Sequence, residues 1–186
     1  MNSLDLHLDS EVVLPYKIYL GEVQENLSAL LLENRHPMGA SDFIKRLKRI
    51  EVYPEVLERW NNLCPTLADA IVVHPYGSIR IIRGNARLWN FITKSELHEG
   101  VIELKGNSYD ALGSAHILGM QILNYRRKRD DLRNVFSYLD ISLENCSFCL
   151  PKVRDYPYLT LLAFNHSAKV LGASRLDENG YLIGVR

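Results

Sequence analysis

The chain has 186 residues, of which 47% are hydrophobic and 24% charged, a composition typical of a globular protein with a substantial core. Its 22 basic and 22 acidic residues give a formal net charge of zero. This balance excludes attraction of nucleic acid or acidic membranes by the surface as a whole, so any such binding requires a local patch. The length suits a single domain spanning residues 1–186.

Three features of the sequence bear on where the protein works. The acidic N-terminal residues lack the basic and apolar regions of a signal peptide. No apolar run approaches the roughly 18 residues that a membrane-spanning helix needs. The three cysteines, an odd number, do not make a disulfide framework. We expect a cytoplasmic protein that does not bind membranes, and the sequence does not indicate an oligomeric state.

Residues 1–73 are predicted to be mainly helical. They begin with a β-rich stretch, residues 12–20, in which Pro15 lacks an amide proton and favours an edge strand. The spacing of apolar residues predicts a helix over 22–34, and Ser41 is expected to cap a second over 42–50. Prolines then begin two more predicted short helices, over 54–63 and, after Pro65, over 67–73.

Residues 74–186 are predicted to combine a sheet with one long helix. Residues 78–84 alternate like a half-buried strand, and 86–92 and 101–105 are further strand candidates in a central β-meander. A helical pattern from Ser108 to about Tyr138 has a stripe for packing on this meander. The stripe consists of Leu112, Ala115, Gly119, Ile122 and Leu123.

The tail is again predicted to be β. Residues 158–164 form an apolar strand, and residues 168–176 and 181–185 flank Asn179-Gly180, a strong hairpin signal. The expected class is therefore α+β, with a helical N-terminal part, a central β-meander packed against one long helix, and a C-terminal β-hairpin.

The sharpest candidate for catalysis is the pair Glu103 and Lys105 at the end of the predicted strand 101–105. Residues two apart on a strand point to the same side, so the two side chains would project together. One class of magnesium-dependent nucleases gathers two carboxylates and a lysine at a strand end, where the carboxylates hold Mg²⁺ against the scissile phosphate. The alternative is an ordinary ion pair on a solvated face of the sheet.

Residues 54–164, with Glu103-x-Lys105, resemble the restriction-endonuclease-like PD-(D/E)xK nuclease superfamily. That family's core runs helix, three strands, helix, strand, which is the predicted order here. Its exonuclease branch often carries a Gln-x-x-x-Tyr motif on the helix after the Glu-x-Lys strand, and Gln121 and Tyr125 have that spacing. The resemblance implies an Mg²⁺-dependent nuclease in which Glu103, Lys105, Gln121 and Tyr125 form the site.

The sequence departs from this family at the metal-binding aspartate. The family often has Gly-x-Ile-Asp on the neighbouring strand, whereas this chain has Gly77-Ser78-Ile79-Arg80. An arginine at that place would repel Mg²⁺. Glu96 and Glu99 precede the strand in a predicted loop, and Asp69 lies far upstream. If the resemblance holds, the protein is a degenerate nuclease or takes its second carboxylate from elsewhere.

The cysteines give a weaker metal signal. Cys146 and Cys149 form a lone C-x-x-C, and a structural zinc site needs four ligands. Some nucleases of the same branch hold an iron–sulfur cluster with four cysteines, and adding Cys64 supplies three. Buried or half-buried thiols are the favoured interpretation, and no cofactor is expected except Mg²⁺ in the nuclease alternative.

Two basic clusters are candidates for binding phosphate. With Arg80, Arg83 and Arg87 of the predicted meander they would form a nucleic-acid-binding face, but nearby acidic residues also allow solvated helix faces. The first cluster is Lys45, Arg46, Lys48 and Arg49, and the second is Arg126, Arg127, Lys128 and Arg129.

Two functions from different classes follow from these observations. The first is a small cytoplasmic, non-enzymatic protein that binds a macromolecular partner, either a protein or a nucleic acid. The alternative is an Mg²⁺-dependent nuclease, or a degenerate relative, centred on Glu103 and Lys105. A small-molecule enzyme with an unrecognised site is a third possibility.

Overall fold

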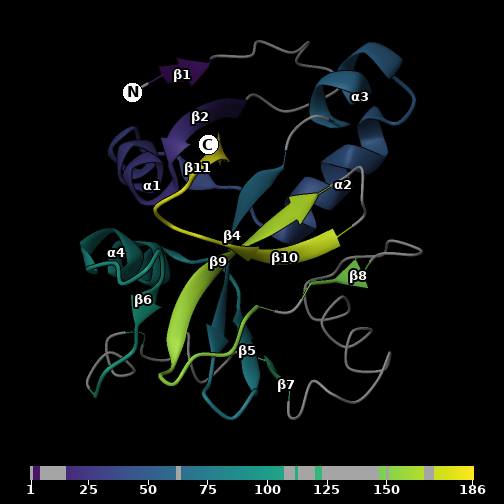
Figure 1. Ribbon diagram of the computed structural model, residues 1–186. Coiled ribbons are helices and arrows are strands. Elements are labelled where there is room, and N and C mark those ends of the chain that lie inside the picture. Colours follow the sequence, from purple (N-terminus) through teal and green to yellow (C-terminus); the bar gives the residue numbers. More distant parts are fainter. Residues whose placement is uncertain are drawn as a thin grey trace.

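The computed structural model describes residues 2–4, 16–61, 64–106, 112, 120–122, 147–149, 151–165 and 170–186. Within these residues, eleven strands form one mixed sheet, and helices lie on both of its sides (Figure 1). The protein thus combines helices and strands, as expected for an α+β chain. No helix in these ranges is long and apolar enough to cross a membrane.

The four helices whose bounds the structure gives lie before residue 95. They are α1 (Val23–Leu32), α2 (Ala40–Ile50), α3 (Pro54–Asn61) and α4 (Ala86–Lys94). The strands before residue 100 are β1 (Asn2–Leu4), β2 (Tyr16–Glu22), β3 (His36–Pro37), β4 (Pro65–Val73) and β5 (Ile79–Ile82). The later strands are β6 (Ile102–Glu103), β7 (Met120–Ile122), β8 (Ser147–Phe148), β9 (Tyr158–Asn165), β10 (Val170–Ser174) and β11 (Asn179–Val185).

Strand β4 is the centre of the sheet, and the sheet forks along one of its edges. The other edge pairs with β9 in antiparallel register, interrupted by an irregularity between Thr66 and Ala70. On the forked edge, Pro65 and Thr66 pair with β11 in parallel, whereas residues 70–73 pair with β5 in antiparallel register. Residues 67–69 lie between these two partners. We call this three-residue gap in the pairing the sheet fork.

Both faces of β4 are buried because helices cover both. Leu67, Ile71 and Val73 face a cluster that includes side chains of α2 and α3. Ala68, Ala70 and Val72 face a second cluster that includes side chains of α1 and α4. All nine residues of β4 are buried. A strand buried on both faces is continuously apolar rather than alternating.

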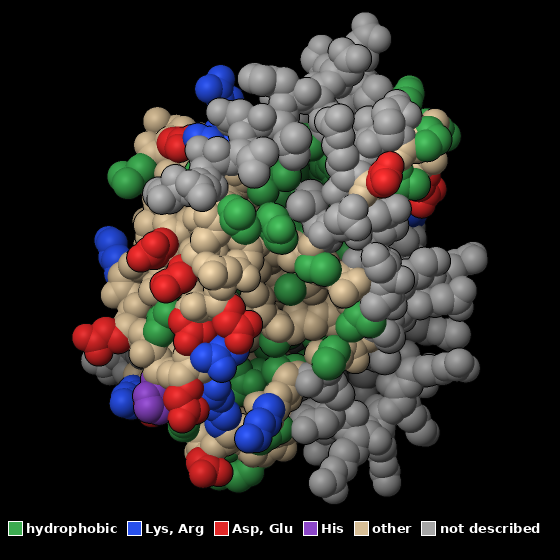
Figure 2. All heavy atoms as spheres, turned by 45° about the horizontal axis from the view of Figure 1, so that its top comes forward, with side chains coloured by type: hydrophobic (Ala, Val, Ile, Leu, Met, Phe, Trp, Pro, Cys, Tyr) green, Lys and Arg blue, Asp and Glu red, His purple; other side chains and the backbone are tan. Residues whose placement is uncertain are grey.

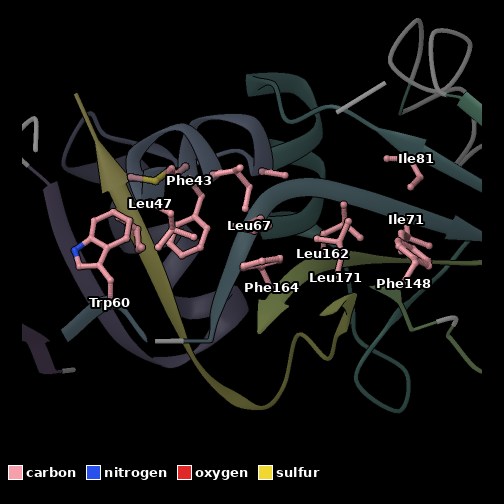
Figure 3. Close-up of a cluster of buried hydrophobic side chains, with 14 of the residues drawn as sticks. Phe43, Leu47, Trp60, Leu67, Ile71, Ile81, Phe148, Leu162, Phe164 and Leu171 are labelled. Atoms are coloured by element: carbon pink, nitrogen blue, oxygen red, sulfur yellow. The ribbon is translucent and has the colours of Figure 1, made fainter. Parts of the chain in front are cut away.

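Aromatic rings anchor the cluster under α2 and α3 (Figure 3). The Phe43 ring stacks on Trp60, with centroids 5.2 Å apart, and meets Phe164 of β9 edge-on at 5.8 Å. The Trp60 indole donates a hydrogen bond of 3.0 Å to the Tyr16 hydroxyl. These contacts fix α2 and α3 against β4, β9 and β2, which positions the N-terminus of α2 beside the sheet fork.

Two predicted elements have the opposite type of structure. Residues 67–73, predicted as a helix, form most of β4, because an apolar run without polar interruptions fits a doubly covered strand as well as a helix. Residues 86–92, predicted as a strand, form α4, which Asn85 caps by accepting a 3.0 Å hydrogen bond from the Leu88 amide. Strands β2 and β4 also mean that residues 1–73 are not simply helical.

The prediction of one long helix over 108–138 is also wrong in part. Strand β7 at Met120–Ile122 interrupts the helix predicted over 108–138, because these residues pair with Arg80 and its neighbours in β5. In the predicted packing stripe, Leu112 is helical and buried, Ile122 belongs to β7, and Ala115, Gly119 and Leu123 lie outside the described residues.

The C-terminal strands exist, but they do not form a hairpin. Strand β10 pairs with β9 and β8, whereas β11 pairs with β2, β3 and β4. Residues 175–178 therefore cross from one part of the sheet to another. The predicted turn residues Asn179 and Gly180 are the first residues of β11.

The remaining elements agree with the sequence in type. The helices expected over 22–34, 42–50 and 54–63 are α1, α2 and α3. Gly39 rather than Ser41 is the residue that precedes α2. The strands expected over 12–20, 78–84, 101–105 and 158–164 correspond to β2, β5, β6 and β9, and Pro15 lies outside the described residues.

Candidate functional site

Glu103 and Lys105 lie close together and form an ion pair, although β6 ends at Glu103 and Lys105 lies beyond it. The Lys105 ammonium is 2.8 Å from a carboxylate oxygen of Glu103. Lys105 is largely exposed, with 76% of its side chain accessible, and Glu103 is half-buried at the end of β6. The hydrogen bond from Lys105 to Glu103 raises the pKa of the lysine, and Glu96 adds a smaller electrostatic contribution.

A second carboxylate does share this region, because Glu96 lines the same cavity as Glu103 and Lys105. This cavity has a volume of about 370 Å³. Glu99, the other acid before the strand, instead pairs with Arg154 at 2.9 Å. Among the described residues, no three His, Cys, Asp or Glu side chains are grouped closely enough to hold a metal ion. Glu103 is already paired with the Lys105 ammonium.

Gln121, the first residue of the proposed exonuclease-type motif, is not helical as expected. It lies in β7, where it pairs with Arg80. Tyr125 lies outside the described residues, as do Arg126, Arg127, Lys128 and Arg129 of the second basic cluster. Cys146 also lies outside them. Cys149 is an exposed free thiol, so the expectation that it is buried or half-buried is wrong, and Cys64 is likewise an exposed free thiol.

The first basic cluster forms a cationic face on α2. The buried side of this helix consists of Ala40, Phe43, Ile44, Leu47 and Ile50, which pack into the core. Lys45, Lys48 and Arg49 are consequently exposed on the opposite side, and Arg46 is half-buried at its border. Partial burial lowers the pKa of Arg46, while Asp42 one turn earlier opposes that shift.

A buried carboxylate, Asp69, lies where this helix meets the sheet fork. One of its oxygens accepts a 2.6 Å hydrogen bond from the Ala40 amide, the first residue of α2, and the other accepts a 2.9 Å bond from the Gly84 amide. Gly39 has no side chain to cap α2, so Asp69 caps the helix from a neighbouring strand. Asp69 thus joins α2 to the loop between β5 and α4.

Gly84 allows that loop to approach β4 closely. An alanine Cβ at this position would lie 2.6 Å from the Ala68 carbonyl oxygen, a distance that real contacts do not reach. On the same stretch of β4, the Ala68 amide donates to the Met38 carbonyl at 2.9 Å, and its carbonyl accepts from the Trp89 indole at 3.2 Å. Loop and helix atoms therefore satisfy the backbone of the fork in place of a neighbouring strand.

The fork opens into a cavity of about 490 Å³. Its walls include the rings of His36 and Trp89, whose centroids lie 5.6 Å apart at an interplanar angle of 33°. Asp69 contributes a carboxylate, while Lys45 of α2 and Arg83 of the β5–α4 loop contribute cations. A cavity of this volume, with apolar, aromatic and charged side chains in its walls, is large enough for a small ligand.

The charges around Asp69 act in opposite directions. Burial, which disfavours the ionised carboxylate, raises its pKa above the ordinary value of 3.8. The two amide donors and the nearby Arg83 lower the pKa and partly offset that effect. A perturbed carboxylate in a cavity is a common property of functional sites.

Sequence reasoning missed this site almost entirely. It identified Lys45 and placed Arg83 on a phosphate-binding face, and both do line the cavity at the fork. It left Asp69 unassigned and did not consider His36 or Trp89 together. One signal was available: Asp69 is the only polar residue among Leu67–Val73, a run that is otherwise apolar. A charged residue in such a run is rarely buried without a specific partner.

Acidic and basic side chains are intermixed on the face shown in Figure 2, in keeping with the neutral net charge. The cationic face of α2 is therefore a local feature.

Comparisons with models of protein families, with characterised proteins and with solved structures find no significant match.

Proposed function

We propose that this protein binds single-stranded nucleic acid, with phosphates along the cationic face of α2 and a base entering the cavity at the sheet fork. The observation that carries the proposal is the position of Lys45. This residue belongs both to the exposed basic face of α2 and to the lining of the cavity, together with Arg83. A strand bound along α2 would thus pass directly over the cavity mouth.

The two parts of the site match two of the components of a nucleotide, the phosphate and the base. Single strands are bound by cationic surfaces that follow the phosphates and by aromatic side chains on which the bases stack. Lys45, Lys48 and Arg49 supply the first, over about one turn of α2. His36 and Trp89 supply the second in the cavity wall. The proposed function is binding rather than catalysis.

The test is the salt dependence of oligonucleotide binding. The affinity for a single-stranded ten-nucleotide DNA is measured by fluorescence anisotropy from 50 to 300 mM KCl. Each phosphate contact contributes about −0.7 to the slope of log K against log salt concentration for a single strand. Replacing Lys45 and Lys48 by glutamine is expected to make the slope shallower by about 1.4.

A matched control separates a local contact from a change in net charge. Lys94 and Lys152 are also exposed lysines, and they lie outside the cavity lining and the cationic face of α2. Replacing this pair by glutamine changes the net charge equally and is expected to leave the slope within about 0.3 of the wild-type value. Equal effects of the two double variants would contradict the proposal.

The shared cavity of Glu96, Glu103 and Lys105 favours a second candidate, a nuclease or degenerate nuclease-fold protein. It is tested by incubating single- and double-stranded DNA with the protein and Mg²⁺ or Mn²⁺. Cleavage that is lost in both Glu103→Ala and Glu96→Ala would support this candidate. Cleavage that persists in both variants would assign the activity to another site or a contaminant.

A further inference from the structure

We infer that the cavity at the sheet fork selects guanine, with Asp69 as the group that recognises the base. The inference rests on the proposed function, since it specifies which base the same site accepts. The ligand chemistry is a guanine nucleotide, either free or within a strand.

Asp69 retains acceptor capacity after its structural bonds are made. An ionised carboxylate offers about four acceptor positions on its two oxygens. The Ala40 and Gly84 amides occupy one position on each oxygen. About two positions therefore remain, one on each oxygen, and Asp69 also lines the cavity. A ligand with two adjacent N–H donors can use both of them.

Guanine is the common base that presents such a pair. Its Watson–Crick edge carries the N1–H and N2–H groups side by side, and both can donate to one carboxylate. Adenine and cytosine each place a ring-nitrogen acceptor beside their amino group, and uracil places carbonyl oxygens on both sides of its N–H. An acceptor facing the Asp69 carboxylate would leave buried polar atoms unpaired, which is costly.

The rest of the cavity suits a planar base with a phosphate. The rings of His36 and Trp89 and the small side chain of Ala68 lie in its lining, so a flat ring can pack against aromatic and apolar atoms. Lys45 and Arg83 also line it and can interact with the phosphate of the same nucleotide. Asp42 is a further lining residue, and its charge disfavours anions at its own end of the cavity.

Trp89 provides a direct readout of occupancy. The chain has two tryptophans, and the other, Trp60, is fully buried in the core cluster away from the cavity lining. Titration of the protein with 5′-GMP, AMP, CMP and UMP is followed by tryptophan fluorescence. We expect 5′-GMP to quench the signal saturably and to bind about 5- to 100-fold more tightly than the other three, as one two-bond base contact provides. The quenching should disappear in Trp89→Phe, which keeps Trp60.

Two substitutions test the assigned contacts. Asp69→Asn replaces one acceptor by a donor and is expected to remove the preference for 5′-GMP, while the exposed Asp155→Asn should retain it. His36→Ala shortens an exposed side chain and does not depend on the capping bonds of Asp69. It should weaken 5′-GMP binding at least 5-fold through lost stacking, with unchanged circular dichroism. Unchanged 5′-GMP binding in His36→Ala would overturn the inference even if Asp69→Asn fails to fold.

The source of the base is resolved with two ten-nucleotide strands, one all thymine and one with a single central guanine. Tighter binding of the guanine strand supports both the inference and the proposed function. Selective 5′-GMP binding without strand binding supports a free-nucleotide site and overturns the proposed function. Salt-dependent strand binding without any base preference overturns the inference and leaves the proposed function standing. No binding of either probe overturns both.

Discussion

Removal of the Asp69 carboxylate is expected to destabilise the fold substantially, because this one side chain caps α2 and holds the β5–α4 loop. In Asp69→Ala, the amides of Ala40 and Gly84 lose their acceptors at 2.6 and 2.9 Å. Each buried amide left without a partner costs about 1–3 kcal/mol. Asp69→Ala also removes the cost of burying an ionised carboxylate, and it is this burial that raises the pKa of Asp69. The removal offsets part of the loss.

The expected net loss in the free energy of unfolding is about 2–4 kcal/mol at pH 7, which corresponds to a fall in Tm of about 4–16 °C for a protein of this size. Urea denaturation followed by circular dichroism measures it. Asp155→Ala, at an exposed loop position, serves as the control and should change stability by less than about 0.5 kcal/mol. A loss in Asp69→Ala no larger than in this control would refute the capping role of Asp69.

Three further predictions concern stability. Burial raises the pKa of Asp69 above 3.8, so protonation of Asp69 stabilises the folded state. This contribution is complete below pH 3.8 and is lost as pH rises through the folded-state pKa. The free energy of unfolding of the wild type minus that of Asp69→Asn should therefore fall over that pH window. Gly84→Ala should lower the free energy of unfolding by about 1–3 kcal/mol, since the new Cβ would lie 2.6 Å from a backbone oxygen of β4. In the control Gly172→Ala, the new Cβ makes only an ordinary 3.4 Å contact. Equal Tm values for the two variants would contradict this prediction. Glu33 should contribute with the opposite pH dependence, because its pKa is lowered, chiefly by the hydrogen bond from Lys17. Glu33→Gln should destabilise the protein slightly above pH 4.5 and not at pH 2, as measured in paired thermal melts.

Helices α1, α2 and α3 could be predicted from sequence, and α2 shows why. Its apolar residues recur at intervals of three and four, and the exposed positions between them are charged. The periodic pattern depends only on local geometry, and burial of one face satisfies it. The same pattern also placed Lys45, Lys48 and Arg49 on the exposed side of the helix.

Strand β4 and helix α4 could not be assigned in this way, for two different reasons. Every residue of β4 is buried, so its sequence carries no periodicity that distinguishes a strand from a helix. In α4 the buried residues are Leu88, Trp89 and Ile92, which have the spacing of a helix. The predicted segment has only seven residues, however, which are too few to distinguish a helix from a strand. In the structure Asn85 caps this helix, because its side chain accepts a hydrogen bond from the Leu88 amide.

The candidate site residues show the same difference between features that local sequence predicts and features that it does not. Glu103 and Lys105 were predicted to lie together because they are two residues apart on one predicted strand. They do form an ion pair, but β6 ends at Glu103 and Lys105 lies beyond it. The cavity at the sheet fork instead combines residues from β3, α2, β4, the β5–α4 loop and α4. Their proximity follows from the order of strands in the sheet. Neither the C-terminal crossing of β11 nor the fork that it creates is encoded in local sequence patterns.

The place of β11 in the sheet also constrains how the chain acquires its structure during synthesis. Among the described strands, β1, β2 and β3 connect to β4 only through β11, which follows all of them in sequence. While a ribosome is still translating the middle of the protein, β2 and the forked edge of β4 lack their shared partner. Such unpaired edges favour association with other chains, and closure over a long loop is slow. We therefore expect nascent chains that lack β11 to depend on chaperones, and the cavity at the fork to form late, after β11 has emerged from the exit tunnel.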